Sequence, residues 1–193
     1  MGSNETKRGA ARDTILQAVL DLIARDGIDA VTHRSAAESS SVSPGTVTYH
    51  FPSREKLIDA AFSKYVADYQ VSLNQAIASQ PIRTREDLLK FLVGTTGLSP
   101  DALSLACIEA ELALLSHRSG RLASVLQAWQ RAMEPILCDV LERTGVPRPV
   151  EAARTLTAIC RGTEFEVMAR GSAISPETLH ARLETALRGL QEG

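Results

Sequence analysis

Residues 32–51 constrain the fold of this chain more than any other stretch, because their pattern predicts two short helices joined by a tight turn. Thr32 has the hydroxyl that a helix N-cap needs, and the small residues Ala36, Ala37 and Ser40 follow it at helical spacing. Side chains of this size allow another helix to pack closely. We therefore expect a first helix of about two turns that lies against a neighbouring helix.

The second helix of this stretch is predicted to begin at Pro44. Ser43 supplies a hydroxyl cap, and proline is favoured at the first helical position. Val47 and Phe51 lie four residues apart and point inward, whereas the remaining surface is polar and rich in hydrogen-bond donors. This arrangement matches the helix-turn-helix, which places its second helix in the major groove of DNA.

Two stretches, Ala30 to Arg34 and Gly45 to Leu57, resemble the TetR family of transcriptional regulators. The resemblance covers residues 12–60 and fixes several residue types at set spacings. The family usually has glycine where this chain has Ser41, and a left-handed backbone there costs a non-glycine residue about 1 kcal/mol. This departure predicts a slightly remodelled turn.

The rest of the chain reads as helices separated by hydroxyl caps, prolines and glycines. We predict an all-α fold, in which Pro135 should kink one helix. It divides into a flexible basic arm (1–11), a three-helix helix-turn-helix DNA-binding domain (12–56) and a larger C-terminal helical domain for ligand binding and dimerisation (57–193). The nine expected helices cover residues 12–26, 32–40, 44–51, 53–77, 84–97, 99–115, 120–145, 149–169 and 175–190.

Composition excludes several classes of protein. The chain has 193 residues, 44% apolar content and a net charge of -2, which argues against indiscriminate coating of nucleic acid. Residues 1–56 carry seven basic and seven acidic side chains, so any DNA affinity must come from their local arrangement. No apolar run is long enough for a membrane span and no signal region opens the chain, so we expect a cytoplasmic protein without a membrane partner.

The predicted DNA contacts lie in and around the helix-turn-helix. A threonine methyl and a tyrosine ring suit thymine, hydroxyls and imidazole suit phosphate or base acceptors, and cationic side chains suit phosphate. Structural roles remain open for both histidines and for Tyr49, and the cations after the motif could form a solvated face. The candidates are Thr32, His33, Arg34, Ser43, Pro44, Gly45, Thr46, Thr48, Tyr49, His50, Arg54 and Lys56.

The last two predicted helices carry more apolar surface than a monomer can cover. Residues 150–169 have apolar or small side chains on nearly every side, and the helix after Pro176 has one leucine-rich face. A twofold homodimer through a four-helix bundle of these helices would bury both, as the resemblance also implies. Such a dimer would present two recognition helices about 34 Å apart to a near-palindromic operator.

The resemblance implies that the C-terminal domain binds a small-molecule effector. Two acidic residues amid apolar neighbours, Glu111 and Glu164, could meet a polar group of the ligand or a structural partner such as Arg161. Converging apolar stripes would form the cavity. Its candidate lining residues are Phe91, Cys107, Glu111, Trp129, Met133, Cys160, Glu164 and Phe165.

The sequence contains no catalytic motif, and its three cysteines are too scattered for a zinc site, so we predict neither an enzyme, a metal site nor a cofactor. The favoured function is a ligand-responsive transcriptional repressor that binds operator DNA as a homodimer. The first alternative is an activator of the same fold. The second is a helical small-molecule carrier or enzyme without a DNA-binding role.

Overall fold

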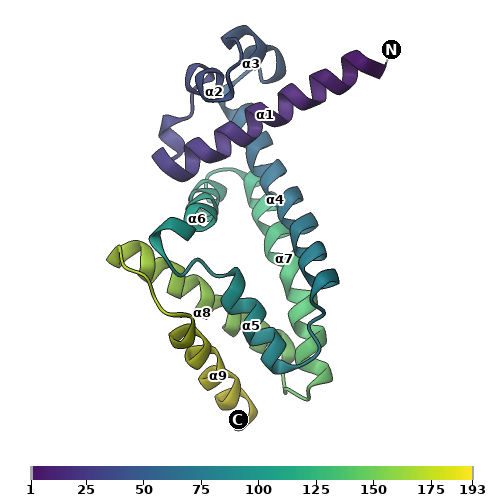
Figure 1. Ribbon diagram of the computed structural model, residues 1–193, viewed down its shortest axis with the longest axis vertical. Helices are drawn as coiled ribbons and strands as arrows, with labels where there is room; N and C mark the ends of the chain where they lie inside the picture. Colours follow the sequence, from purple (N-terminus) through teal and green to yellow (C-terminus); the bar gives the residue numbers. More distant parts are fainter. Residues whose placement is uncertain (1, 193) are drawn as a thin grey trace. The chain divides into compact units, whose positions relative to one another are not determined.

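The computed structural model describes the backbone of residues 2–192 and the side chains of residues 9–100 and 102–190. Within these residues the chain is all-α, with nine α-helices and no strand, as predicted (Figure 1). The elements are α1 (Gly2–Asp26), η1 (Ile28–Ala30), α2 (His33–Ser40), α3 (Pro44–His50), α4 (Arg54–Ser79), α5 (Arg85–Thr95), η2 (Pro100–Ala102), α6 (Ser104–Ser116), α7 (Gly120–Arg143), α8 (Pro149–Arg170) and α9 (Pro176–Glu192), where η marks a short 3-10 helix.

The helices pack as two compact units. The first unit contains the chain up to Tyr69 and residues 107–127, and the second contains residues 70–106 and the chain from Ala128 onwards. Helices α4, α6 and α7 each continue from one unit into the other. The predicted domain boundary between residues 56 and 57 falls inside α4 and stays a prediction.

Two helices differ from their expected bounds by more than two residues. Helix α1 begins at Gly2 rather than at Arg12: residues 2–11 contain no proline to stop the helix, and Lys7, Arg8, Ala10 and Ala11 are good helix formers. The helix expected over residues 99–115 is instead the 3-10 turn η2 followed by α6. The amide of Leu103 donates to the Pro100 carbonyl, the three-residue spacing of a 3-10 helix, before α6 begins.

The first unit has a continuous apolar core. Helix α1 packs against α2, and α2 packs against α3 (Figure 1). Burial of Ile15 and Val19 on α1, of Ala36 on α2, and of Val47 and Phe51 around α3 confirms the inward face predicted for each helix. The outer surface of α3 is thereby left facing away from the core.

The turn between α2 and α3 keeps the geometry that glycine would allow. Ser41 has φ 56° and ψ 35°, in the left-handed region. Its amide donates to the Glu38 carbonyl at 3.3 Å, and the amide of Val42 donates to the Ala37 carbonyl at 3.0 Å. These two bonds form a Schellman motif, so the expected remodelling of the turn is not found.

Replacing Ser41 by glycine is expected to raise the free energy of unfolding by about 0.5–1 kcal/mol. The change removes a left-handed penalty of about 1–2 kcal/mol, partly offset by the greater freedom of glycine in the unfolded chain. Chemical denaturation measures the difference. Ser39→Gly is the control: Ser39 is exposed inside α2, so glycine there should lower stability by about 0.5 kcal/mol. A destabilising S41G would contradict the strain at this turn.

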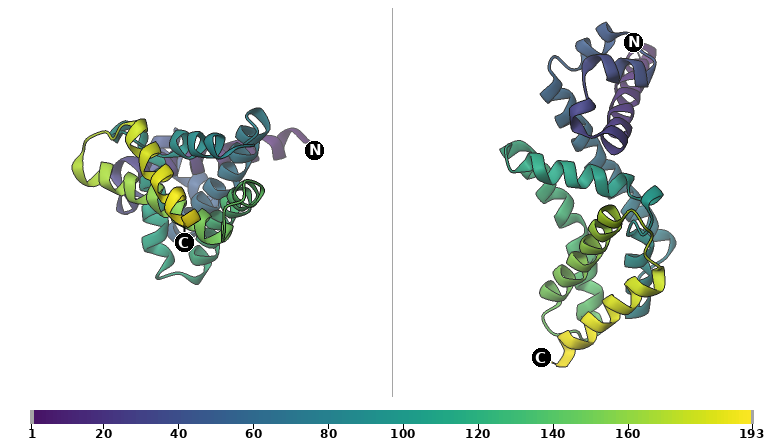
Figure 2. Two further views of the ribbon diagram at one scale, coloured as in Figure 1. Left: turned by 90° about the horizontal axis from the view of Figure 1, so that it is seen from below. Right: turned by 90° about the vertical axis from the view of Figure 1, so that its left-hand side faces the viewer.

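The second unit is built around α5, α7, α8 and α9. Helix α9 packs against both α5 and α8, and α8 and α9 lie side by side in Figures 1 and 2. Its core consists of buried aliphatic side chains from all four helices, among them Leu88, Leu137, Leu156, Leu179 and Leu183. Among the described residues, no helix combines the length and the hydropathy that a membrane crossing requires.

Candidate nucleic-acid interface and effector region

Side-chain caps fix the two helices of the helix-turn-helix. The Thr32 hydroxyl accepts from the Ser35 amide, and the Ser35 hydroxyl accepts from the Thr32 amide, which completes a capping box at the start of α2. The Ser43 hydroxyl accepts from the Thr46 amide at 3.1 Å, and Pro44 occupies the first turn of α3. Both predicted caps are therefore confirmed.

The outer face of α3 is polar and exposed. Tyr49 has 67% of its surface exposed and Thr48 is also exposed, whereas Thr46 and His50 are half-buried. The Tyr49 ring meets the His50 ring edge to face, with 5.2 Å between centroids. Tyr49 is thus directed outward rather than packed into the core of the first unit.

Short bonds between neighbours hold this face in place. The Thr46 and Ser43 hydroxyl oxygens are 2.9 Å apart, and the Thr48 hydroxyl donates to the Pro44 carbonyl at 3.1 Å. Gly45 is exposed next to them. The threonine methyl groups and the Tyr49 ring therefore have defined positions from which to meet bases or sugars.

His33 and Arg54, two predicted DNA contacts, hold the first unit together. The His33 Nε2 atom lies 2.7 Å from the Phe51 carbonyl oxygen, which fixes the chain after α3. The Arg54 guanidinium donates to the carbonyls of Val31 at 2.7 Å and Ile28 at 2.6 Å. These bonds favour the structural alternative for His33, and they give Arg54 a structural role that neither a DNA contact nor a solvated face predicts.

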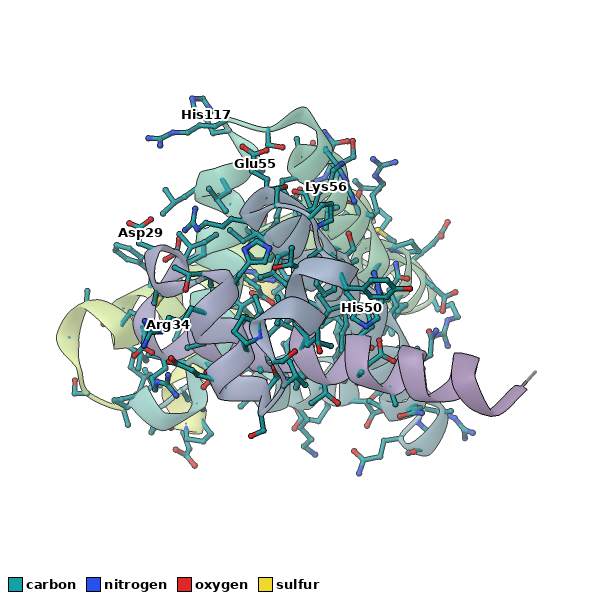
Figure 3. All side chains as sticks on the ribbon, turned by 90° about the horizontal axis from the view of Figure 1, so that it is seen from above. Asp29, Arg34, His50, Glu55, Lys56 and His117 are labelled. Carbon is teal, nitrogen blue, oxygen red and sulfur yellow. The ribbon has the colours of Figure 1, made fainter. Side chains whose placement is uncertain are left out.

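The other two cations are exposed. Arg34 pairs with Glu38 at 2.9 Å, but its side chain remains 85% exposed. Lys56 is exposed in the first turn of α4. Figure 3 views the molecule from the α3 side and shows Arg34, His50 and Lys56 well apart from one another. Both side chains are exposed and accessible to phosphates. Their role in DNA binding stays a prediction.

The sequence did not indicate the role of Arg12. Its guanidinium carbon lies 5.6 Å from the centroid of the Phe51 ring, a cation–π distance that joins α1 to the end of α3. Its side chain is 48% exposed. Nothing in the spacing of the two residues signals this contact, because it depends on how α1 packs.

The predicted effector residues are divided between the two units. Cys107 and Glu111 belong to the first unit, where Glu111 Oε1 accepts from the Ile28 amide at 3.2 Å and so anchors the loop after α1. Phe91 and Met133 are partly buried against the core of the second unit. Phe165 is 69% exposed on α8. The structural alternative thus accounts for Glu111, and Phe165 lies on the surface.

Trp129, Cys160 and Glu164 lie within the second unit. Trp129 is 5% exposed, and the Arg161 guanidinium carbon lies 3.9 Å from the centroid of its ring. Glu164 Oε1 accepts from the Gly97 amide at 3.2 Å. Burial raises the pKa of the Cys160 thiol to about 11, with the nearby Glu164 carboxylate adding to the rise and the Thr96 hydroxyl opposing it, so this thiol is protonated at neutral pH.

Replacing Glu164 by glutamine is expected to raise the melting temperature at pH 7. Burial raises the pKa of Glu164, although Arg161 and the Gly97 amide oppose the shift. A raised folded-state pKa means that stability falls as pH rises from the ordinary value of 4.5 through the folded-state pKa. Glutamine can still accept from Gly97 without carrying a charge. Thermal unfolding of both proteins across pH 4 to 8 should show that the difference between their melting temperatures widens toward neutral pH.

Glu166→Gln, two residues further along α8, provides a control of opposite sign. A bond from Arg182 at 2.8 Å, with Arg170 also nearby, lowers the pKa of Glu166. At pH values above the ordinary pKa of glutamate, the ionised Glu166 carboxylate stabilises the folded state. Glutamine at this position should therefore lower the melting temperature. Equal shifts for both variants would contradict the opposite environments of the two carboxylates.

Comparisons with known proteins agree with this geometry. Residues 15–61 match the family model described as "Bacterial regulatory proteins, tetR family", and residues 83–193 match "Tetracyclin repressor-like, C-terminal domain". The Escherichia coli tetracycline repressor protein class D is 24% identical over 143 residues, covering 68% of this chain. The match spans 66% of the length of that relative.

Solved structures share the fold over nearly the whole chain. A transcriptional regulator from Rhodococcus sp. Rha1 has a TM-score of 0.79 at 21% identity, covering 94% of this chain and 96% of its own. A putative transcriptional regulator from Saccharomonospora viridis, in complex with choline, has a TM-score of 0.76 at 22% identity, covering 93% and 96%. At these identities the likeness shows the fold alone. The two family models together cover most of the sequence, and the chain therefore belongs to the TetR family, whose members are DNA-binding transcription factors and not enzymes.

Proposed function

We propose that this regulator is a homodimeric repressor that binds a near-palindromic operator and leaves it when a small-molecule effector binds. The observation that carries the DNA-binding part is the outer face of α3. There, Thr48 and Tyr49 are exposed on a helix that Ser43 caps and whose other side, at Val47, is buried. A short rigid helix with an exposed polar face is what major-groove reading requires.

The surface of α8 supports the proposed dimer. Ala158, Gly162, Phe165 and Ala169 are all exposed at spacings of four, three and four residues, so they share one face of the helix. Three small residues around a large aromatic side chain allow a second helix to approach closely. We place the twofold contact on this face together with the exposed side of α9.

Dimerisation connects the second unit to operator reading. A twofold axis repeats α3, and two recognition helices about 34 Å apart meet successive major grooves on one side of a duplex. Each half-site then contributes its contacts twice. The operator predicted for this protein is accordingly a near-palindrome.

Release of the operator by the effector requires a conformational change that alters both DNA binding and effector binding. Helix α4 begins beside α3 and continues from the first unit into the second, so a tilt of α4 would alter the separation of the two recognition helices. A difference of about 2–3 kcal/mol in effector affinity between the two conformations is enough to release most operator complexes. The Saccharomonospora viridis relative, solved with choline, supports effector binding by a protein of this fold.

A gel-shift experiment with the DNA that flanks the protein's own coding sequence tests the proposal. We expect one flanking segment to give a retarded band that survives excess unrelated DNA. Scrambling the palindrome within that segment should abolish the band. Salt-sensitive retardation that is equal for all sequences would instead indicate non-specific phosphate binding. That result would overturn the proposed operator function.

A further inference from the structure

Three side chains of the second unit form a compact cluster between α7 and α8. The Arg161 guanidinium carbon lies 3.9 Å from the centroid of the Trp129 ring, and Arg161 Nη1 is 3.7 Å from Glu164 Oε2. The other Glu164 oxygen, Oε1, accepts from the amide of Gly97 after α5. An indole face and a carboxylate thus both lie close to one cationic group.

An aromatic face beside a carboxylate is the usual recognition site for an organic cation. The negative face of an indole attracts a cation within about 6 Å of its centroid, and a carboxylate close by neutralises the charge. In this cluster the attracted cation is the protein's own Arg161. The site therefore has the chemistry of a cation receptor that an internal group occupies.

Arg161 is more exposed than its two partners. Its side chain is 37% exposed, whereas the Glu164 side chain is 12% exposed and Trp129 is 5% exposed. The separation of 3.7 Å from Glu164 exceeds the 2.7–2.9 Å of a charge-assisted hydrogen bond, so the pair lacks the forked geometry that makes arginine contacts strong. Of the three side chains, Arg161 therefore lies nearest to solvent, and Glu164 and Trp129 are the buried ones.

Departure of Arg161 would leave a buried carboxylate without its neighbouring charge. A buried charge without a partner is costly, so the vacated position favours a second cation. The Gly97 amide holds Glu164 in place and keeps the carboxylate facing the cluster. A ligand that brings a positive charge to the indole face therefore restores what the departing guanidinium removes.

We propose that the cluster of Trp129, Arg161 and Glu164 is the effector site and that its ligand is a small organic cation which displaces Arg161 from the indole face and pairs with Glu164. The inference rests on the proposed effector-responsive function and names the chemical class of the effector. It assigns the three residues different roles. Trp129 and Glu164 bind the ligand, and Arg161 competes with it.

Isothermal titration calorimetry with choline tests this assignment on the full-length protein without DNA. The matched neutral probe is 3,3-dimethylbutan-1-ol, which has carbon in place of the quaternary nitrogen. We expect Arg161→Ala to bind choline about tenfold more tightly than the unaltered protein, and Glu164→Gln to bind it about tenfold more weakly. Binding of the neutral probe should be much weaker and should not differ among the variants.

Two further variants keep the test decisive. Arg170→Ala removes another exposed arginine from α8, one that pairs with Glu166, and should leave choline affinity unchanged. Arg161→Gln removes the charge but keeps most of the side chain, and it replaces Arg161→Ala if the alanine variant melts at a lower temperature. Equal choline affinity for the Arg161 variants and the unaltered protein, equal affinity for both probes, or no binding in any variant would overturn the inference.

Failure of the proposed cation site can be distinguished from failure of the proposed repressor function. Gel shift reports operator binding without effector, and calorimetry reports cation binding without DNA. Specific retardation with no choline binding would reject only the cation site. Choline binding with no sequence-specific retardation would reject the repressor and leave a cation-binding helical protein.

Discussion

Replacing Tyr49 by alanine is expected to lower the affinity of the protein for its operator by roughly thirtyfold or more. Tyr49 is 67% exposed in the last turn of α3, where it can contact thymine methyls or the DNA backbone. A good contact contributes about 1–3 kcal/mol, and a dimer makes it twice, so at least about 2 kcal/mol is lost. Quantitative gel shift or fluorescence anisotropy at one fixed salt concentration measures the change.

The stability of the Tyr49→Ala protein should change little, because an exposed side chain contributes little to the core. Tyr49→Phe separates the ring from the hydroxyl and should retain most of the affinity if the ring makes the contact. Leu114→Ala is the matched control: Leu114 is 70% exposed, belongs to the same unit and lies on α6 rather than α3. Unchanged operator affinity in Tyr49→Ala would mean that the outer face of α3 does not read the DNA.

The helix-turn-helix could be predicted in detail because its signals are local. Thr32, Ser43 and Pro44 each act within one turn of their own position, so their caps follow from sequence alone. The inward faces at Val47 and Phe51 follow from helical periodicity. Ser41 is the exception, because the expected remodelling of its turn is not found: the Schellman bonds donated by the amides of Ser41 and Val42 offset the left-handed penalty of about 1–2 kcal/mol.

Polar partners distant in sequence could not be predicted. His33 bonds a carbonyl 18 residues away, Arg54 one 26 residues away, and Glu111 an amide 83 residues away. Each of these side chains satisfies a backbone group at a helix end or loop that needs a partner. Tertiary packing decides which backbone group needs a side-chain partner. In the sequence, a charged side chain that binds phosphate or ligand therefore looks the same as one that bonds a loop backbone.

The two carboxylates of the predicted effector region illustrate the same limit. Both Glu111 and Glu164 accept a bond from a backbone amide. Glu164 lies beside an aromatic face and a cation, and burial raises the pKa of its carboxyl group. If Glu164→Gln both raises the melting temperature and weakens cation binding, the buried charge is retained at a cost in stability for the sake of binding.

Phe165 marks a different limit. Apolar residues on nearly every side of residues 150–169 indicate burial all round, which predicts that Phe165 lines an internal cavity. The structure instead leaves it 69% exposed, beside Gly162 and in line with Ala158 and Ala169. A core face and an interface face require the same apolar residues, so periodicity alone cannot separate them.

Replacing Phe165 by glutamate is expected to convert the dimer into monomers. The twofold axis would bring the position and its copy into one contact, so each dimer loses two buried rings, about 1.5–3 kcal/mol apiece, and gains two unpaired charges. A loss of at least about 4 kcal/mol raises the dissociation constant roughly a thousandfold. Light scattering during size exclusion at micromolar protein should report the mass of one chain.

Leu114→Glu introduces the same charge at an equally exposed leucine outside the last two helices and should remain a dimer. Operator binding provides a second readout, because a monomer engages only one half-site and loses the contacts of the other. The concentration at which Phe165→Glu regains operator binding should therefore match the concentration at which it regains the dimer mass. A dimeric Phe165→Glu protein would place the twofold contact elsewhere, and a monomer with undiminished operator affinity would show that paired recognition helices are not required.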